Sequence, residues 1–156
     1  KMMKYIQYQK DLNKVLESEI VGEALFNTLA KHAKSADQQQ KWHVLAELET
    51  QTLFRFKAFI QHNGLNASSR PHIKAQGIIS GIALSKLPWS AVMYLIKDGT
   101  QPFMRTFERL CQNSNYETYD FFQYVLRHEQ SIQHFATCEL AKQSMTSLDQ
   151  VLLLLD

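Results

Sequence analysis

The chain has 156 residues and a formal net charge of only +2, and hydrophobic residues make up 45% of it. A chain of this length is expected to form one domain, residues 1–156, with a core that needs no staples. The small net charge and the lack of a basic run exclude an electrostatic nucleic-acid binder. The longest apolar stretch, around residues 78–84, is too short to span a bilayer, so we expect no membrane partner.

The cysteines and the first residues favour a reduced, cytoplasmic protein. Cys111 and Cys138 are far apart and form no CxxC pair. Both lie in helical patterns, where a free cysteine behaves as a small apolar residue. Residues 1–6 contain no apolar segment followed by a cleavage signal.

Apolar residues recur at three- and four-residue steps along most of the chain, and no segment alternates as a strand would. We therefore predict an all-α fold with at least two-thirds helix. Residues 35–37 (Ser-Ala-Asp) are expected to end one helix and cap the start of the next, and Asn63 with Gly64 to end that second helix. The predicted long antiparallel helices cover residues 5–33, 38–62, 88–112 and 116–143.

Two features interrupt this pattern. The connection over residues 63–88 is long and contains a short apolar helix near residues 72–85, which fits a bundle whose second and third helices are joined by a crossover. Pro102 removes a backbone donor inside the third long helix and is expected to kink or restart it. A last short helix is expected between residues 147 and 155.

Glutamates occupy the predicted inner faces of three helices: Glu19 with Glu23 on the first, Glu49 on the second and Glu129 on the fourth. An unpaired buried carboxylate is costly, whereas a metal ion removes that cost by supplying positive charge. Several carboxylates converging in a bundle core are what a di-metal site needs. We therefore expect Glu19, Glu49 and Glu129 to point into one inter-helix space as candidate metal ligands.

Two other acids on the second and fourth long helices are expected on the outer faces of those helices. Glu47 and Glu139 are predicted to face outward, away from the bundle core.

Three segments resemble the ferritin-like carboxylate proteins, such as rubrerythrin, bacterioferritin and the aldehyde-deformylating oxygenases. Residues 19–26 (EIVGEALF) look like the first-helix signature of that family. Residues 45–52 (LAELETQT) are similar to its second-helix Glu-x-x-His, and residues 127–132 (RHEQSI) lie where the fourth-helix Glu-x-x-His would be. The resemblance covers most of the chain and implies a ferritin-like four-helix bundle, with a long crossover carrying an extra short helix, around a di-metal site.

The chain departs from that family pattern at several positions. Thr52 and Ile132 stand where the two histidines would be, and no Glu-x-x-His occurs anywhere in the chain. The third-helix glutamate has no clear equivalent, and Asp98 is the best candidate. His128 could substitute as a ligand, but it lies about 100° around the helix from Glu129, which favours a partly exposed or hydrogen-bonded histidine.

Two function classes stay open from the sequence. The missing histidines favour a degenerate bundle without a working di-iron centre or cofactor, acting as a scaffold, binding module or small-molecule carrier. The retained acids favour a metal-dependent oxidoreductase or an iron-binding protein that uses iron or manganese, with Glu23, Asp98 and His128 as additional candidate ligands. Catalysis is left open, as is a small-molecule ligand in the bundle core. We expect a two-fold homodimer, the commonest closed assembly.

Overall fold

The computed structural model describes residues 2–156, and helix makes up 79% of it, with no strand in that range. This confirms the predicted all-α class and the predicted helical content. No helix in the described range is long and apolar enough to cross a membrane. The six helices are α1 (Met2–Lys31), α2 (Ala36–His62), α3 (Ile73–Ser85), α4 (Trp89–Gln112), α5 (Tyr119–Leu140) and α6 (Asp149–Leu154).

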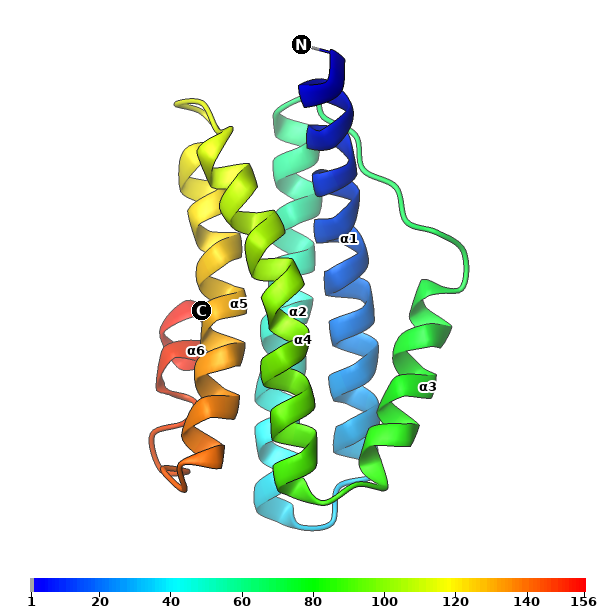
Figure 1. Cartoon of the computed structure of the whole chain (residues 1–156), viewed down its shortest axis with the longest axis vertical. Helices are drawn as coiled ribbons and strands as arrows, with labels where there is room; N and C mark the ends of the chain where they lie inside the picture. Colours follow the sequence, from blue (N-terminus) through cyan, green and yellow to red (C-terminus); the bar gives the residue numbers. More distant parts are fainter. Residues whose placement is uncertain (1) are drawn as a thin grey trace.

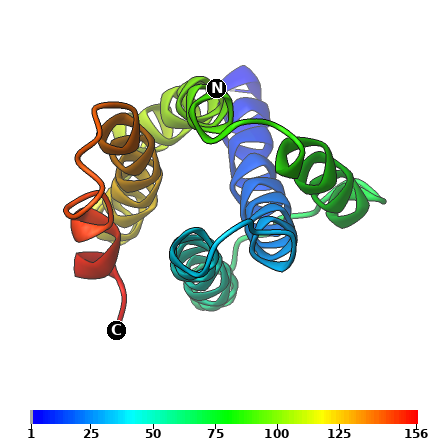
Figure 2. The same ribbon diagram turned by 90° about the horizontal axis from the view of Figure 1, so that it is seen from below.

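The four long helices lie side by side, with α3 outside α1 and α6 beside α5 (Figures 1 and 2). In Figure 1, α1 runs down and α2 runs up, and the loop with α3 then brings the chain back down. Helix α4 runs up and α5 down, so α2 and α4 point the same way. The closest packing is within the pairs α1–α2 and α4–α5, and α3 packs on α1.

The predicted ends of α2 are confirmed by its capping contacts. The backbone N–H of Gln38 donates to the Ser35 side chain at 3.1 Å, as an N-cap requires. At the other end Asn63 is the C-cap, and Gly64 has a φ of 61°, a left-handed conformation that glycine adopts at little cost.

Pro102 kinks α4 but does not restart it. The helix continues from Trp89 to Gln112, and Figure 1 shows that its axis changes direction near the middle. Proline has no N–H for the carbonyl of Asp98, and Asp98 is exposed, so water can replace the missing donor. The hydroxyl of Thr106 donates to the carbonyl of Pro102 at 3.2 Å, a contact of the kind that often bends a helix.

Two glycines one turn apart set the position of α3 against α1. A Cβ atom at Gly77 would lie 2.7 Å from the carbonyl oxygen of Val21. A Cβ atom at Gly81 would lie 2.7 Å from the Cβ atom of Thr28. Only residues without a side chain allow this approach, so the glycines hold the crossover helix on the outer side of α1.

We predict that Gly81→Ala destabilises the protein by about 1–3 kcal/mol, because the added methyl group forces α3 away from α1. Gly99→Ala is the matched control: Gly99 is an exposed position of α4, and a Cβ atom there meets nothing within 4 Å. That change should stabilise by about 1 kcal/mol through helix propensity. Urea unfolding followed by circular dichroism measures both. Equal effects of the two substitutions would contradict the glycine contact.

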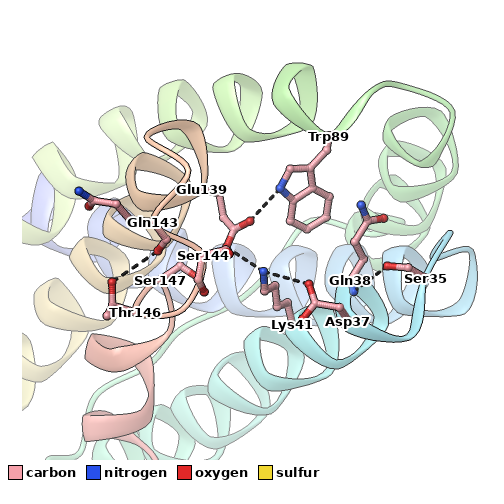
Figure 3. Close-up of polar contacts among 10 residues, drawn as sticks. All are labelled: Ser35, Asp37, Gln38, Lys41, Trp89, Glu139, Gln143, Ser144, Thr146 and Ser147. Atoms are coloured by element: carbon pink, nitrogen blue, oxygen red, sulfur yellow. Dashed lines mark hydrogen bonds and ion pairs between the residues drawn. The ribbon is translucent and has the colours of Figure 1, made fainter.

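Glu139 is buried, which corrects the prediction that it faces outward, whereas Glu47 is exposed as expected. The carboxylate of Glu139 lies 2.9 Å from Nζ of Lys41, and Nε1 of Trp89 donates to its other oxygen at 2.9 Å (Figure 3). These contacts join α2, α4 and α5. A buried acid is tolerated here because an opposite charge and an indole donor satisfy both of its oxygens.

Lys41 is also buried and lies 3.1 Å from Asp37, whose side chain is 76% exposed. Burial lowers the pKa of Lys41, but the bonds to Glu139 and Asp37 outweigh this and raise it. The lysine is therefore charged, and its charge is balanced mainly by the buried partner.

We predict that Glu139→Ala costs about 3–5 kcal/mol of stability, since it leaves the buried Lys41 charge unpaired. Asp37→Ala removes only the exposed partner and should cost less than about 1 kcal/mol. Thermal and urea unfolding of the two variants give the comparison. A Glu139→Ala variant as stable as Asp37→Ala would mean that water reaches Lys41.

Candidate metal centre

Three donor side chains occupy equivalent positions on three helices: Glu19 on α1, Glu49 on α2 and His128 on α5. Each is part of a buried series with alternating three- and four-residue steps, the spacing by which a helix faces the axis of a bundle. The series are Leu12, Val15, Glu19, Gly22, Phe26, Leu29; Trp42, Leu45, Glu49, Thr52, Phe56, Phe59; and Val125, His128, Ile132, Phe135, Glu139.

The three side chains converge on one point. Nε2 of His128 lies 3.1 Å from Oε1 of Glu19 and 3.1 Å from Oε1 of Glu49. Glu19, Glu49 and His128 are 0%, 3% and 1% exposed. One donor atom from each residue lies within 4.8 Å of the other two, so the group could hold a metal ion.

A backbone carbonyl of α5 fixes which nitrogen of the His128 imidazole carries the hydrogen. Its Nδ1 lies 2.6 Å from the carbonyl oxygen of Val125. A carbonyl oxygen can only accept, so Nδ1 carries the hydrogen in this contact. In the neutral ring Nε2 then presents its lone pair to the two carboxylates, which is the usual arrangement of a histidine ligand. The ring of Phe107 on α4 lies 5.9 Å from the imidazole and covers one side of it.

Two oxygen atoms of this group form no hydrogen bond with the described residues: Oε2 of Glu19 and Oε1 of Glu49, although the second lies 3.1 Å from Nε2 of His128. The Ser18 hydroxyl oxygen lies 3.2 Å from Oε1 of Glu19, but it also lies 2.8 Å from the carbonyl oxygen of Val15, which competes for its one hydrogen. A single hydrogen on Nε2 of His128 could serve only one carboxylate. Buried polar atoms without partners are rare in native proteins, and an absent ion is one explanation for them.

The spacing of the donor atoms suits a small cation. Two ligand atoms about 2.1 Å from one ion, at a right angle, lie about 3.0 Å apart. The two distances from Nε2 of His128 are both 3.1 Å. The donor set of two carboxylates and one imidazole suits divalent first-row metals.

Gly22 makes room for the carboxylate of Glu49. A Cβ atom at this position would overlap Oε2 of Glu49 and lie 2.7 Å from its Cδ atom. The glycine lies one turn after Glu19 on α1. The same segment of α1 therefore carries Glu19 and leaves space for the side chain of Glu49. The group therefore depends on four residues, of which only three carry donor atoms.

Burial and mutual charge set the protonation of the group. Burial raises the pKa of Glu49 well above its ordinary value, and the neighbouring charge of Glu19 raises it further. Burial lowers the pKa of His128, but the charges of Glu19 and Glu49 outweigh it, so the pKa of His128 is raised well above its ordinary value. Without a metal ion the group therefore holds protons more tightly than isolated side chains do.

The other candidate ligands are not among the three residues whose donor atoms converge. Glu129 is buried but does not belong to the converging group. Burial raises its pKa to about 7. Glu23 is partly exposed and accepts a hydrogen bond from Thr50, and Asp98 is exposed beside the kink of α4. Glu19 and Glu49 therefore converge with His128, one of the additional candidate ligands, while Glu129 lines a cavity beside Glu49.

A cavity of about 180 Å³ adjoins the group, and Glu49 and Glu129 both line it. The other side chains around it are mostly apolar and come from α1, α3, α4 and α5. They include Leu25, Phe26, Leu84, Leu95, Ile96, Phe103 and Ile132. Glu49 therefore contacts His128 and also lines this apolar cavity.

The sequence predicts an inner face of α5 centred on Glu129, with His128 partly exposed or hydrogen-bonded. His128 is hydrogen-bonded to the carbonyl of Val125 and fully buried. Glu129 and His128 are both buried, along with neighbours on either side of them. The available signal was the three- and four-residue spacing of His128 from Val125, Ile132 and Phe135, which puts the histidine on the axis of the bundle.

Scans against protein-family models, the curated proteins and the solved structures each returned no match to this chain.

We predict that the metal-free protein loses stability as pH rises from 6 to 9. Groups whose pKa is raised on folding stabilise the native state while protonated, and this contribution is lost as pH rises through the folded-state pKa. Glu49 and His128 both shift in this direction, in a site that also faces Glu19 and Glu129.

Thermal melting across this pH range, in chelator, measures the effect. Glu49→Gln should flatten the profile, and Glu47→Gln, an exposed acid on the same helix, should leave it unchanged. A wild-type melting temperature that is constant or rises with pH would contradict the prediction.

Proposed function

We propose that this protein is a ferritin-like helical bundle that binds one divalent transition-metal ion through Glu19, Glu49 and His128. The observation that carries the proposal is the convergence of three buried donor atoms with two carboxylate oxygens that form no hydrogen bond. A divalent cation would balance two carboxylates and remove the cost of burying them. The hydrogen bond from His128 to Val125 supports this role, because it leaves Nε2 available as a ligand.

Iron(II) or manganese(II) suits this donor set best. Imidazole is a ligand of iron and zinc, and carboxylates are ligands of manganese and magnesium, so the mixture favours a borderline divalent ion. A structural zinc site closes its coordination with four protein ligands, whereas three ligands leave positions open for water or substrate. The open positions are consistent with a metal-dependent oxidoreductase, one of the two function classes that the sequence leaves open.

A single ion is proposed because this chain lacks the ligands for a second one. Thr52, at the position of a family histidine, shares a hydrogen bond of 3.1 Å with the Tyr124 hydroxyl. Ile132, at the other histidine position, is part of the apolar core. Glu23 and Asp98 lie outside the group, so neither carboxylate completes a two-metal site.

The ferritin-like assignment is supported by the path of the chain. Two hairpins, α1–α2 and α4–α5, pack together, and the long connection with α3 joins them (Figure 1). The candidate ligands come from both hairpins, as they do in the carboxylate bundles of that family. The expected homodimer stays a prediction.

A metal-free binding module or carrier is the second candidate. Its specific support is the raised pKa of His128, because a protonated imidazole between Glu19 and Glu49 would also balance part of their charge. On this alternative the group is a buried ion cluster that stabilises the bundle, and chelators have no effect on melting.

We predict that protein loaded anaerobically with Fe(II) or Mn(II) binds about one ion per chain. At a hundredfold excess over the dissociation constant, binding contributes about 2.7 kcal/mol of stability. For a chain of this size that raises the melting temperature by about 5–10 °C. Metal content by elemental analysis and melting with and without chelator measure both quantities.

The variants separate a ligand role from a merely structural one. Glu49→Gln and His128→Asn should lower metal content and abolish the chelator-sensitive part of the melting temperature. Gly22→Ala should act in the same way, because it displaces the Glu49 carboxylate without removing a donor. Glu47→Gln and His43→Gln, at exposed positions of α2, are the controls. Wild-type melting that ignores both chelator and added metal would favour the metal-free alternative.

A further inference from the structure

We propose that the cavity beside Glu129 binds a small primary amine with an apolar body, of about the size of benzylamine. The proposal goes beyond the metal site, because it concerns a second ligand whose acidic partner, Glu129, is not one of the proposed metal ligands. It rests on a mismatch in the cavity lining: the walls are apolar, and two acidic side chains line the cavity with no basic side chain beside them.

The volume and the walls determine the body of the ligand. A cavity of about 180 Å³ exceeds the roughly 150 Å³ that holds a benzene molecule in an engineered apolar cavity. Leucine, isoleucine and phenylalanine side chains of four helices provide most of the lining. An aromatic ring or a short branched chain therefore fills the space and replaces water at apolar walls.

The polar lining determines the head group. The hydroxyl of Ser18 donates to the carbonyl of Val15 at 2.8 Å, and that of Thr100 donates to the carbonyl of Lys97 at 2.7 Å. The carboxylates of Glu49 and Glu129 complete the set of polar side chains around the cavity. No lysine, arginine or histidine lines it, so a positive partner for these acids has to come from a bound molecule.

Glu129 gives this end of the cavity its charge. It is 6% exposed, and no described residue forms an ion pair or a side-chain hydrogen bond with it. An ammonium group placed there gains a charge-assisted hydrogen bond and relieves the burial of an unpaired acid. When a metal ion neutralises Glu49, Glu129 remains as the acid that an amine can pair with.

The cavity can be reached from outside between α3 and α4. Leu95 is 50% exposed, and Gly99 is also exposed, whereas Glu49 and Glu129 are buried. All four residues line the same space. A ligand would therefore enter past Leu95 and Gly99 with its ammonium group leading toward Glu129.

The test is calorimetric titration of the whole chain with benzylamine, with benzyl alcohol and benzoate as probes of equal size and different charge. We expect benzylamine to bind at least about tenfold more tightly than benzyl alcohol, and benzoate not to bind. Glu129→Gln should weaken benzylamine binding at least about tenfold, the range of a charge-assisted hydrogen bond. Glu108→Gln, an exposed acid on α4, should leave the affinity unchanged.

A second variant tests the location without touching an acid. Gly99→Phe places a ring at the mouth of the cavity, at an exposed position where a Cβ atom meets no neighbour, and should abolish benzylamine binding. Titration in the presence of chelator separates this proposal from the metal site, since it removes any bound ion and should leave benzylamine binding intact. Equal affinity for benzylamine and benzyl alcohol, or unchanged binding in both Glu129→Gln and Gly99→Phe, would overturn the proposal.

Discussion

The central constraint on this fold is the burial of two carboxylates and one imidazole on the axis of the bundle. Each carboxylate removed from water costs several kcal/mol unless an opposite charge or hydrogen-bond donors compensate for it. Glu19 and Glu49 share a single candidate donor in His128, and two of their oxygen atoms form no hydrogen bond. Neighbouring features favour this arrangement: Gly22 admits Glu49, and the carbonyl of Val125 orients the imidazole.

Two other buried acids in the bundle are each paired with a cation of this chain, as expected for acids with a purely structural role. Asp11 accepts two hydrogen bonds of 2.8 Å from the guanidinium of Arg109, which joins α1 to α4. Glu139 is satisfied by Lys41 and Trp89. Both acids have a cation of this chain beside them. The central group has no lysine or arginine, and this difference is why we assign binding to the centre and stability to the other two.

Much of the helical framework could be predicted from the sequence, because apolar spacing and the cap at Ser35 are local signals. The site was predicted only in part. Glu19 and Glu49 stand out as acids within apolar series, but helix α5 buries a wide face, and a single stripe through Glu129 left His128 and Glu139 outside it. Tertiary partners decide such positions: Lys41 comes from another helix and makes the burial of Glu139 tolerable, and no pattern within α5 contains that information.

The departures from the di-metal pattern become consistent when the two proposals are combined. Where the ferritin-like proteins that the sequence resembles have a histidine on each of two helices, this chain has Thr52, bonded to Tyr124, and Ile132, which lines the cavity. Glu129 then has no second ion to bind and faces a space that Ile132 makes apolar. Burial favours the neutral form of an acid in such a place, and a positive partner stabilises the charged form. One ion at Glu19, Glu49 and His128 and one ammonium group at Glu129 would balance the buried charge with two separate ligands.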